Sequence, residues 1–251
     1  MNEIIQNLAK LFLKNKSPTL TVVGVGPGDP SLLTIGALKA IQKANFIFYP
    51  VSSLKEESHA AKIVKNYIRF KKKFPILFPM AREELNPDQI WENAAKKIIT
   101  CLNKDNYAVL LCLGDISVFA SSSYLISKIK KLQPRIIIKN QPGISSLSAA
   151  AAYANYDLIK KGEILKVLEC PNSSKNLINL INEEINKKNV IALFKVGKRW
   201  SWVKEILEKE KLLNKALLAS NIGFDDQFID IASKNKSDDL PYFSLLIIRF
   251  N

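Results

Sequence analysis

Residues 22–30 read Val-Val-Gly-Val-Gly-Pro-Gly-Asp-Pro, an apolar strand-like run that passes directly into a glycine-rich turn. Three glycines within five residues permit positive φ angles and let a ligand approach the main chain closely. Asp29-Pro30 then leads into a helical pattern, and the first N–H groups of such a helix can donate hydrogen bonds to a ligand. The spacing of Gly24 and Gly26 matches the dinucleotide-binding motif Gly-x-Gly-x-x-Gly poorly, because Asp29 occupies the position of the third glycine. The stretch therefore predicts a strand–turn–helix unit, either as a ligand site or as a plain connection.

Outward from this turn, strand-like runs alternate with helical patterns along almost the whole chain. This alternation is typical of α/β architecture with largely parallel strands. We expect strands near 19–25, 46–49, 74–78, 108–113, 135–138, 164–168 and 190–195, and helices near 32–44, 59–68, 87–102, 121–132, 145–153, 174–186 and 200–208. The last three strand-like runs, 216–219, 228–231 and 242–250, have no long helix between them. An antiparallel region is therefore expected near the end of the chain.

The chain is long enough for two domains. Its 251 residues, 47% of them hydrophobic, can bury one large core or two modest ones. The best boundary is the Lys-Asn-Gln-Pro-Gly segment at 139–143, because asparagine, proline and glycine interrupt regular structure there. Apolar residues near the start fall on one helical face. We therefore expect a helical extension over 1–18 and α/β domains over 19–140 and 141–251.

Several classes of protein are excluded by composition. No apolar run approaches the roughly 20 residues that span a bilayer, and the first residues contain no signal-peptide apolar region. The three cysteines, Cys101, Cys112 and Cys170, are odd in number and far apart, which fits neither a disulfide framework nor a zinc site. His59 is the single histidine, so a multi-histidine metal site is excluded. These features predict a cytoplasmic protein in a reducing compartment, without a metal site or a membrane partner.

The formal net charge is +14, from 37 Lys and Arg against 23 Asp and Glu. Such a surplus is compatible with nucleic-acid binding. However, only five of the basic residues are arginines, the type favoured for base and phosphate recognition. The same charge can also attract an anionic small molecule to a cleft, or can be a solvated surface. We expect no nucleic-acid partner.

Four further segments follow the opening turn in a fixed order: Leu113-Gly114-Asp115, Gln-Pro-Gly-Ile-Ser-Ser at 141–146, Ala-Leu-Phe-Lys-Val-Gly at 192–197, and Ser-Asn-Ile-Gly at 220–223. Taken alone, each is also compatible with a strand-end turn, a serine helix cap or plain core. Together they resemble the tetrapyrrole (precorrin and uroporphyrinogen) methyltransferases, and the resemblance runs from Thr19 to Phe250. It implies two α/β domains with the active cleft between them.

The resemblance also implies a site. S-adenosylmethionine is the implied cofactor, and the residues that match the family's cofactor signatures are Pro27, Gly114, Asp115, Ile116, Val118, Ser145, Ser146, Lys195, Val196, Ile222 and Gly223. On the substrate side the implied residues are Gly28, Asp29, Tyr49 and Ser52, with Asp29 a candidate general base. Each of these is also compatible with a capping or packing role. Methyl transfer from a sulfonium is an in-line displacement driven by proximity and alignment, so it needs no covalent nucleophile and no metal.

The segment after the second strand distinguishes branches of the family. Tyr-Pro-Val-Ser at 49–52 and Leu-Phe-Pro-Met at 77–80 are similar to the precorrin-2 carbon-20 methyltransferases, whereas diphthine synthases and rRNA ribose methyltransferases share the fold without this insert. The resemblance implies methylation of carbon 20 of precorrin-2, or of its cobalt complex, in cobalamin biosynthesis, by a homodimer. The substrate is an anionic tetrapyrrole with eight carboxylates. Residues 55–73, with seven Lys or Arg against two Glu, either flank its entrance or form a solvated face.

Three departures from the family surround the expected cofactor site. Ile116 stands where the family has proline, Phe119-Ala120-Ser121 replaces Tyr-Ser-Thr, and Gln141 replaces an aliphatic residue. The loss of proline adds an N–H donor at position 116 and loosens φ. Two alternatives therefore stay open. One is an rRNA ribose methyltransferase of the same fold, which predicts steeply salt-dependent RNA binding; the other is a degenerate homologue that binds tetrapyrrole or cofactor without turnover.

Overall fold

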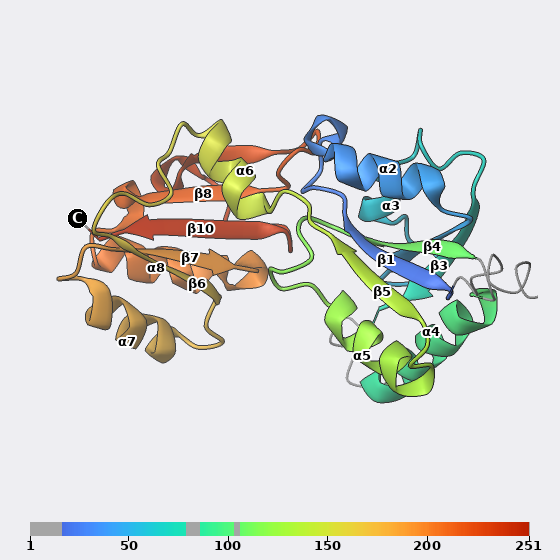
Figure 1. Ribbon diagram of the computed structural model, residues 1–251. Helices are drawn as coiled ribbons and strands as arrows, with labels where there is room; N and C mark the ends of the chain where they lie inside the picture. Colours follow the sequence, from blue (N-terminus) through green and yellow to red (C-terminus); the bar gives the residue numbers. More distant parts are fainter. Residues whose placement is uncertain (1–16, 79–85, 103–105, 251) are drawn as a thin grey trace, which may run out of the picture. The chain divides into compact units, whose positions relative to one another are not determined.

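The computed structural model describes residues 17–78, 86–102 and 106–250, which form two compact α/β units. The first unit holds the chain up to Gly26 and Pro30–Ile144, and the second holds Pro27–Asp29 and the chain from Ser145. The predicted fold class, two α/β domains, is confirmed (Figure 1). The boundary expected after residue 140 falls inside strand β5 (Ile137–Gln141), because this strand begins and ends later than its pattern indicated. The helix expected over the first 16 residues lies outside the described residues.

The first unit contains one parallel sheet. Its other strands are β1 (Thr19–Gly24), β2 (Phe46–Val51), β3 (Lys72–Leu77) and β4 (Tyr107–Cys112), in the order β3-β2-β4-β1-β5. Every pairing in this sheet is parallel. All five strands therefore direct their carboxyl ends to one edge, which is where parallel α/β sheets place their ligands. The loops that follow β1, β2, β4 and β5 carry most of the predicted site of this unit.

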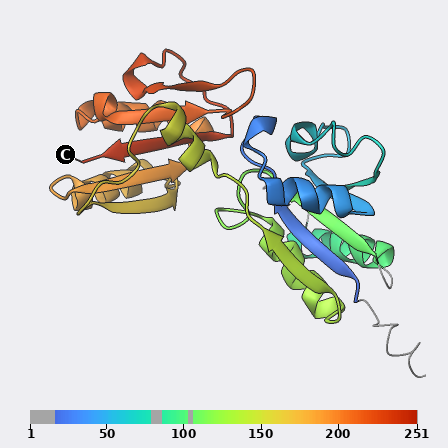
Figure 2. The same ribbon diagram turned by 45° about the horizontal axis from the view of Figure 1, so that its top comes forward.

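Helices cover both faces of this sheet. Helices α4 (Pro87–Cys101) and α5 (Ser122–Leu132) pack together on one face, as Figure 2 shows, and α2 (Ile35–Lys43) and α3 (His59–Ile63) lie on the other. The core beneath α4 and α5 includes Ile98, Leu110 and Leu125, all fully buried. Burial of such side chains contributes about 1.5–3 kcal/mol each, which holds the strand ends in place.

The second unit contains a mixed sheet of order β6-β7-β10-β8-β9. Its elements are α6 (Ser146–Tyr153), β6 (Ile164–Glu169), α7 (Ser174–Glu184), β7 (Asn189–Phe194), α8 (Trp200–Lys209), β8 (Ala216–Ser220), β9 (Phe228–Ile231) and β10 (Ser244–Arg249). Strands β6 and β7 are parallel, whereas β10 is antiparallel to β7 and β8, and β8 is antiparallel to β9. The antiparallel region expected near the end of the chain is confirmed. Helices α7 and α8 pack on one face around the fully buried Trp200.

Two helix boundaries differ from expectation. Helix α3 ends at Ile63 rather than near residue 68. After Ile63 the chain continues in successive hydrogen-bonded turns, and these turns bury Val64 and Ile68 without a longer helix. Helix α2 begins at Ile35 rather than near residue 32. Here Thr34 is the N-cap, and its side chain accepts a hydrogen bond from the Ala37 N–H at 3.1 Å.

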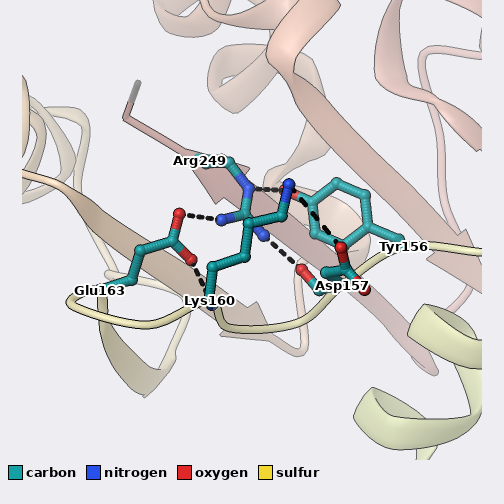
Figure 3. Close-up of polar contacts among 5 residues, drawn as sticks. All are labelled: Tyr156, Asp157, Lys160, Glu163 and Arg249. Atoms are coloured by element: carbon teal, nitrogen blue, oxygen red, sulfur yellow. Dashed lines mark hydrogen bonds and ion pairs between the residues drawn. The ribbon is translucent and has the colours of Figure 1, made fainter.

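Arg249, at the end of β10, fastens the connection between α6 and β6 (Figure 3). Its Nε donates to the Tyr156 Oη at 3.2 Å, and its other nitrogens pair with Glu163 and donate to the Asp157 carbonyl. Glu163 in turn accepts the Lys160 backbone N–H at 2.7 Å. One guanidinium thus satisfies three acceptors, which a planar fork does better than a lysine. Residues 156–163 are thereby held against β10.

Candidate functional site

Three glycines bring the loop ends of the first unit into direct main-chain contact. A Cβ atom on Gly143, after β5, would lie 2.4 Å from the Gly114 carbonyl oxygen, and one on Gly24 would lie 2.6 Å from the Gly143 nitrogen. Gly26 and Gly114 also exchange two backbone hydrogen bonds, of 3.2 and 2.7 Å. There is no room for a side chain at these contacts. The ends of β1, β4 and β5 can therefore converge only because the contacting residues are glycines.

Asp115 fixes this convergence. Its Oδ2 accepts the Gly143 N–H at 2.9 Å and its Oδ1 accepts the Ser117 N–H at 2.8 Å. Burial by itself raises the pKa of this carboxyl, but hydrogen bonds from Ser117, Gly143 and Ile116 outweigh burial and leave the pKa below its ordinary value of 3.8. Asp115 is therefore ionised at neutral pH and joins the loop after β4 to the loop after β5.

The same carboxylate accepts the extra N–H that results from isoleucine, in place of the family's proline, at position 116. The N–H that proline would lack donates to Asp115, as do the Ser117 N–H, the Ser117 hydroxyl and the Gly143 N–H. A carboxylate has about four lone-pair sites, and these four donors fill them. Asp115 thus shapes the loop. The main chain around Gly114 is open: its φ is +72°, and an added Cβ there would meet nothing within 4 Å.

Tyr49 and Ser52 lie at the carboxyl end of β2, which neighbours β4 in the sheet. They therefore share an edge with Gly114, Asp115, Ile116 and Val118, as the prediction requires. The Ser52 hydroxyl donates to the Glu56 carboxylate in the same loop. The first unit thus places the predicted substrate residues Tyr49 and Ser52 at the same sheet edge as four of the eleven predicted cofactor residues.

In the second unit, the Pro27–Asp29 segment packs on the turn after β8. A Cβ on Gly28 would lie 2.3 Å from the Ile222 carbonyl oxygen, and one on Gly223 would lie 2.2 Å from the Asp29 nitrogen. Gly223 has a φ of +80°, and its N–H donates to the Gln227 side chain at 2.7 Å. The predicted residues at 27–29 and 222–223 therefore form one contiguous surface.

Asp29, the candidate base, has a partner that sequence reasoning missed. Tyr153, the last residue of α6, has a pKa raised above its ordinary value of 10.0, first by burial and then by the charge of Asp29 and a hydrogen bond to it. The phenol stays protonated at neutral pH and donates to the Asp29 carboxylate. Nothing in the sequence pattern links these two positions, because the pairing depends on how α6 packs.

The end of β7 carries two more predicted cofactor residues. Val196 is fully buried and its N–H donates to the Ser244 carbonyl at 3.1 Å. Lys195 adopts a left-handed φ of +59°, its Nζ lies 3.1 Å from Glu169 Oε2, and its carbonyl accepts Arg199 Nη1 at 2.9 Å. A non-glycine residue in this conformation stores strain that the surrounding contacts must offset. The main chain of this turn is thus rigidly placed.

Ser145 and Ser146 begin α6. Ser145 is the N-cap, and its hydroxyl accepts the Ser148 N–H at 3.2 Å. The capping interpretation of Ser145 is therefore confirmed, and Ser146 is the first helical residue. The predicted cofactor residues thus divide between the units, and the predicted active cleft between the two domains stays a prediction.

The basic stretch 55–73 does not act as a single surface. Lys72 begins β3, which runs parallel to β2 and pairs Lys72 with Phe46, the first residue of β2. Residues 65–73 therefore lie at the amino edge of the sheet, a strand length of about 17–20 Å from the edge that carries Tyr49 and Gly114. Lys71 there donates to the carbonyls of residues 42 and 44 at the end of α2. The second half of this stretch therefore lies at the opposite sheet edge from Tyr49 and Gly114, and its place at a substrate entrance stays a prediction.

The described residues offer little alternative chemistry. Burial raises the pKa of Cys112 and of Cys170 to about 11, so both thiols are protonated at neutral pH and neither is a nucleophile. In the ranges that the structure describes, no three His, Cys, Asp or Glu side chains lie close enough to hold a metal ion. Over the same ranges, no helix has the length and apolarity needed to cross a membrane.

Comparison with known proteins identifies the class of protein. Residues 19–233 match the family of Tetrapyrrole (Corrin/Porphyrin) Methylases, and the chain belongs to this family. The branch is indicated by two curated relatives. The "Probable cobalt-precorrin-2 C(20)-methyltransferase" of Methanocaldococcus jannaschii is 35% identical over 161 residues, which is 64% of this chain and 66% of the relative. The "Cobalt-precorrin-2 C(20)-methyltransferase" of Salmonella typhimurium is 24% identical over 232 residues, or 91% and 95% of the two chains. The predicted resemblance to the precorrin-2 C(20)-methyltransferases is confirmed.

A solved structure supports the fold. The uroporphyrin-III C-methyl transferase of Thermus thermophilus, crystallised with S-adenosylhomocysteine, superposes with a TM-score of 0.61 at 17% identity and covers 92% of this chain and 97% of its own. S-adenosylhomocysteine is the demethylated form of S-adenosylmethionine. The predicted methyltransferase class is confirmed by the family match and by the names of the curated relatives.

Proposed function

We propose that this protein transfers the methyl group of S-adenosylmethionine to carbon 20 of precorrin-2, or of its cobalt complex, during assembly of the corrin ring. The observation that carries the proposal is the match to enzymes named for this reaction, which covers 91% of the chain in one case. The convergence of Gly24, Gly114 and Gly143 supports it, because it leaves open main chain at the carboxyl edge of a parallel sheet.

The residues present fit the proposed cofactor. Gly114 offers an open, left-handed main chain beside the loop that Asp115 shapes, and Gly223 offers a second left-handed turn. We propose that the first unit contacts S-adenosylmethionine through the main chain around Gly114, with Ile116 and Val118. In the second unit we assign this contact to the Gly223 turn, Val196 and the start of α6. When bound, this cofactor supplies a methyl group on a sulfonium, a good leaving group.

The protein's own task is then alignment, exclusion of water and removal of one proton. Both buried thiols are protonated, so neither Cys112 nor Cys170 serves as a covalent nucleophile. Methylation of carbon 20 requires the proton on that carbon to depart. We assign its acceptance to the Asp29 carboxylate, which Tyr153 orients through its hydrogen bond. Tyr49 and Ser52 then line the substrate side.

The proposed partners follow from charge. Precorrin-2 carries eight carboxylates, and the net charge of +14 attracts it without any nucleic-acid partner. The resemblance to the family supports a homodimer. The three described cysteines are unpaired in this structure, which supports a reducing cytoplasm. Light scattering of the purified protein tests the dimer, for which twice the chain mass of 28.2 kDa is expected.

Turnover tests the activity. Purified protein is incubated with S-adenosylmethionine and either precorrin-2 or its cobalt complex, and the products are weighed by mass spectrometry. One added methyl group on either tetrapyrrole is the expected result, and the faster reaction identifies the physiological form. Methylation of ribosomal RNA with neither tetrapyrrole modified would overturn the proposal, as would cofactor binding without any methyl transfer.

A further inference from the structure

The carboxylates of the first unit gather at one edge of its sheet. Those that the structure describes are Glu56, Glu57, Asp88, Glu92 and Asp115. Two of them follow β2 and one follows β4, so these three lie at the carboxyl ends of parallel strands. The other two lie in the first half of α4, and a helix that connects parallel strands begins at the carboxyl edge. Among the described residues, the amino edge therefore carries no carboxylate.

Cations gather at that amino edge instead. Arg69 and Lys71 end the connection from α3 to β3, and Lys72 and Lys73 begin β3. Further cations lie at the ends of α2 and α5 and just before β5, namely Lys43, Lys130, Lys131 and Arg135. Neighbouring strands are about 4.8 Å apart, so the amino ends of this sheet span roughly 19 Å. The edge is thus a broad positive surface.

This charge is not neutralised from within the unit. In the described ranges, the ion pairs of the first unit join Lys96 to Glu92 and Lys128 to Asp88, and both pairs lie on α4 and α5. The connection between α4 and β4 is described only in part, and its sequence Asn-Lys-Asp at 103–105 adds one charge of each sign. A partner with negative charge is therefore favoured at this edge.

Phe70 projects from the same edge. It is 92% exposed, the largest exposed fraction of any large hydrophobic side chain in the part of the chain that the structure describes. The turn that carries it is well anchored, because Ile68 is buried and its carbonyl accepts the Lys71 N–H at 3.1 Å. The Lys71 Nζ also donates to the carbonyls of residues 42 and 44. The Arg69 guanidinium carbon lies 5.3 Å from the centroid of the Phe70 ring. An apolar side chain is thus held in water among cations.

These features fit a surface that is anionic outside and apolar beneath. Lysines outnumber arginines at this edge, and a lysine is a point charge that suits dispersed anionic headgroups, whereas nucleic-acid recognition favours arginine. An exposed phenylalanine among cations is typical of contacts with the interface of a bilayer. The chain also enters β1 at this edge, and the 16 residues before Ser17 contain Lys10, Lys14 and Lys16 among apolar residues at helical spacing.

We propose that the amino edge of the first unit docks on the surface of an anionic lipid bilayer, with Phe70 inserted among the headgroups. The expectation that the protein has no membrane partner rested on the lack of an apolar run that can span a bilayer, and a peripheral contact needs no such run. The carboxyl edge of the same sheet, with Tyr49 and Gly114, then faces away from the lipid. The proposal does not depend on the reaction assigned to the protein.

Sedimentation of the full chain with vesicles tests the docking. We expect binding to vesicles of phosphatidylcholine and phosphatidylglycerol mixed about two to one, weaker binding as salt is raised, and no binding to phosphatidylcholine alone. Phe70→Ala is expected to weaken binding at least about 10-fold, because an apolar side chain no longer leaves water. The double variant Lys72→Gln with Lys73→Gln is expected to weaken it about 25-fold, from roughly 5-fold for each charge.

Two matched controls isolate this edge. Tyr124→Ala removes an aromatic ring that is 64% exposed, but Tyr124 lies in the first turn of α5, near the carboxyl edge. Lys175→Gln with Lys188→Gln removes two exposed charges from the second unit. Both controls are expected to bind vesicles as the unaltered protein does. Phe70→Leu keeps an apolar side chain without a ring and is expected to retain most of the affinity.

The alternatives give different outcomes. Equal binding to neutral and anionic vesicles, or Phe70→Ala equal to the Tyr124→Ala control, would overturn the proposal. Binding that depends on Lys72 and Lys73 but not on Phe70, and that polyglutamate abolishes, would show a site for an acidic protein surface instead. Tighter binding to single-stranded RNA at the same salt, lost in Phe70→Leu as fully as in Phe70→Ala, would show base stacking and assign the edge to a nucleic acid.

Discussion

Gly143→Ala is the most informative single substitution, because its cost follows from main-chain geometry. The new Cβ would lie 2.4 Å from the Gly114 carbonyl oxygen and 2.7 Å from the Gly24 carbonyl carbon. Real Cβ contacts do not fall below 3.0 Å, so the loops must separate by at least about 0.6 Å, the difference between 3.0 and 2.4 Å. The obstructing atoms are main-chain atoms, and no rotamer change relieves them.

Overpacking of this kind costs about 1–3 kcal/mol, and each kcal/mol lowers Tm by roughly 2–4 °C for a protein of this size. The shift also stretches the 2.9 Å hydrogen bond between Gly143 and Asp115, so binding of S-adenosylhomocysteine is expected to weaken by about 10-fold or more. Scanning calorimetry and titration calorimetry measure the two effects. Gly162→Ala is the control: Gly162 has a φ of +83° with nothing within 4 Å, so alanine there costs about 1–2 kcal/mol of backbone strain without a change in affinity. A Gly143→Ala protein with unaltered Tm and affinity would refute the packing argument.

Three further predictions concern the buried carboxylate of Glu184, the guanidinium of Arg249 and the loop carboxylate of Asp115. Glu184 is fully buried, and hydrogen bonds from Lys166 and Asn189 hold its pKa at about 2, below the ordinary 4.5. The stabilisation that the Glu184 carboxylate contributes is therefore complete above pH 4.5 and is lost as pH falls towards 2. Glu184→Gln should lower the free energy of unfolding by about 1–3 kcal/mol at pH 7 and by progressively less in acid, as measured by urea unfolding at several pH values. A difference in unfolding free energy that stays constant with pH would contradict this. Arg249→Lys should speed amide hydrogen exchange in residues 156–163 without altering α7, because one ammonium cannot replace the guanidinium fork. Asp115→Asn points an amide donor at the Gly143 or Ser117 N–H and should weaken S-adenosylhomocysteine binding about 10-fold, whereas Asp238→Asn should leave it unchanged.

The sequence patterns predicted the strands and most helices to within a few residues, because apolar periodicity decides which face is buried. Helix α3 is the exception. Val64 and Ile68 have helical spacing, but they reach the core through turns, and only the packed sheet shows this. The position of β5 was misjudged for a similar reason, since Ile136 is buried before the strand begins.

The site was predictable only in part. The glycine-rich turn indicated main chain open to a ligand, but Gly24 and Gly28 in that turn pack against the chain's own backbone, and the open main chain lies at Gly114 instead. Gly24 and Gly143, however, are needed because their loops, which are distant in sequence, come into contact. A single amino-acid sequence does not show which loops meet. The same holds for Tyr153 beside Asp29. The charge of residues 55–73 was visible, but its division between opposite sheet edges depends on strand direction.

The position of the transferred methyl group on the macrocycle distinguishes carbon-20 methylation from every other activity of the family. The protein is supplied with precorrin-2, or its cobalt complex, and with S-adenosylmethionine labelled with carbon-13 in its methyl group, and the product is examined by NMR. We predict one enriched methyl signal coupled to carbon 20 of the macrocycle. An enriched methyl at any other ring carbon, or label recovered only in RNA, would refute the assignment of the reaction to carbon 20.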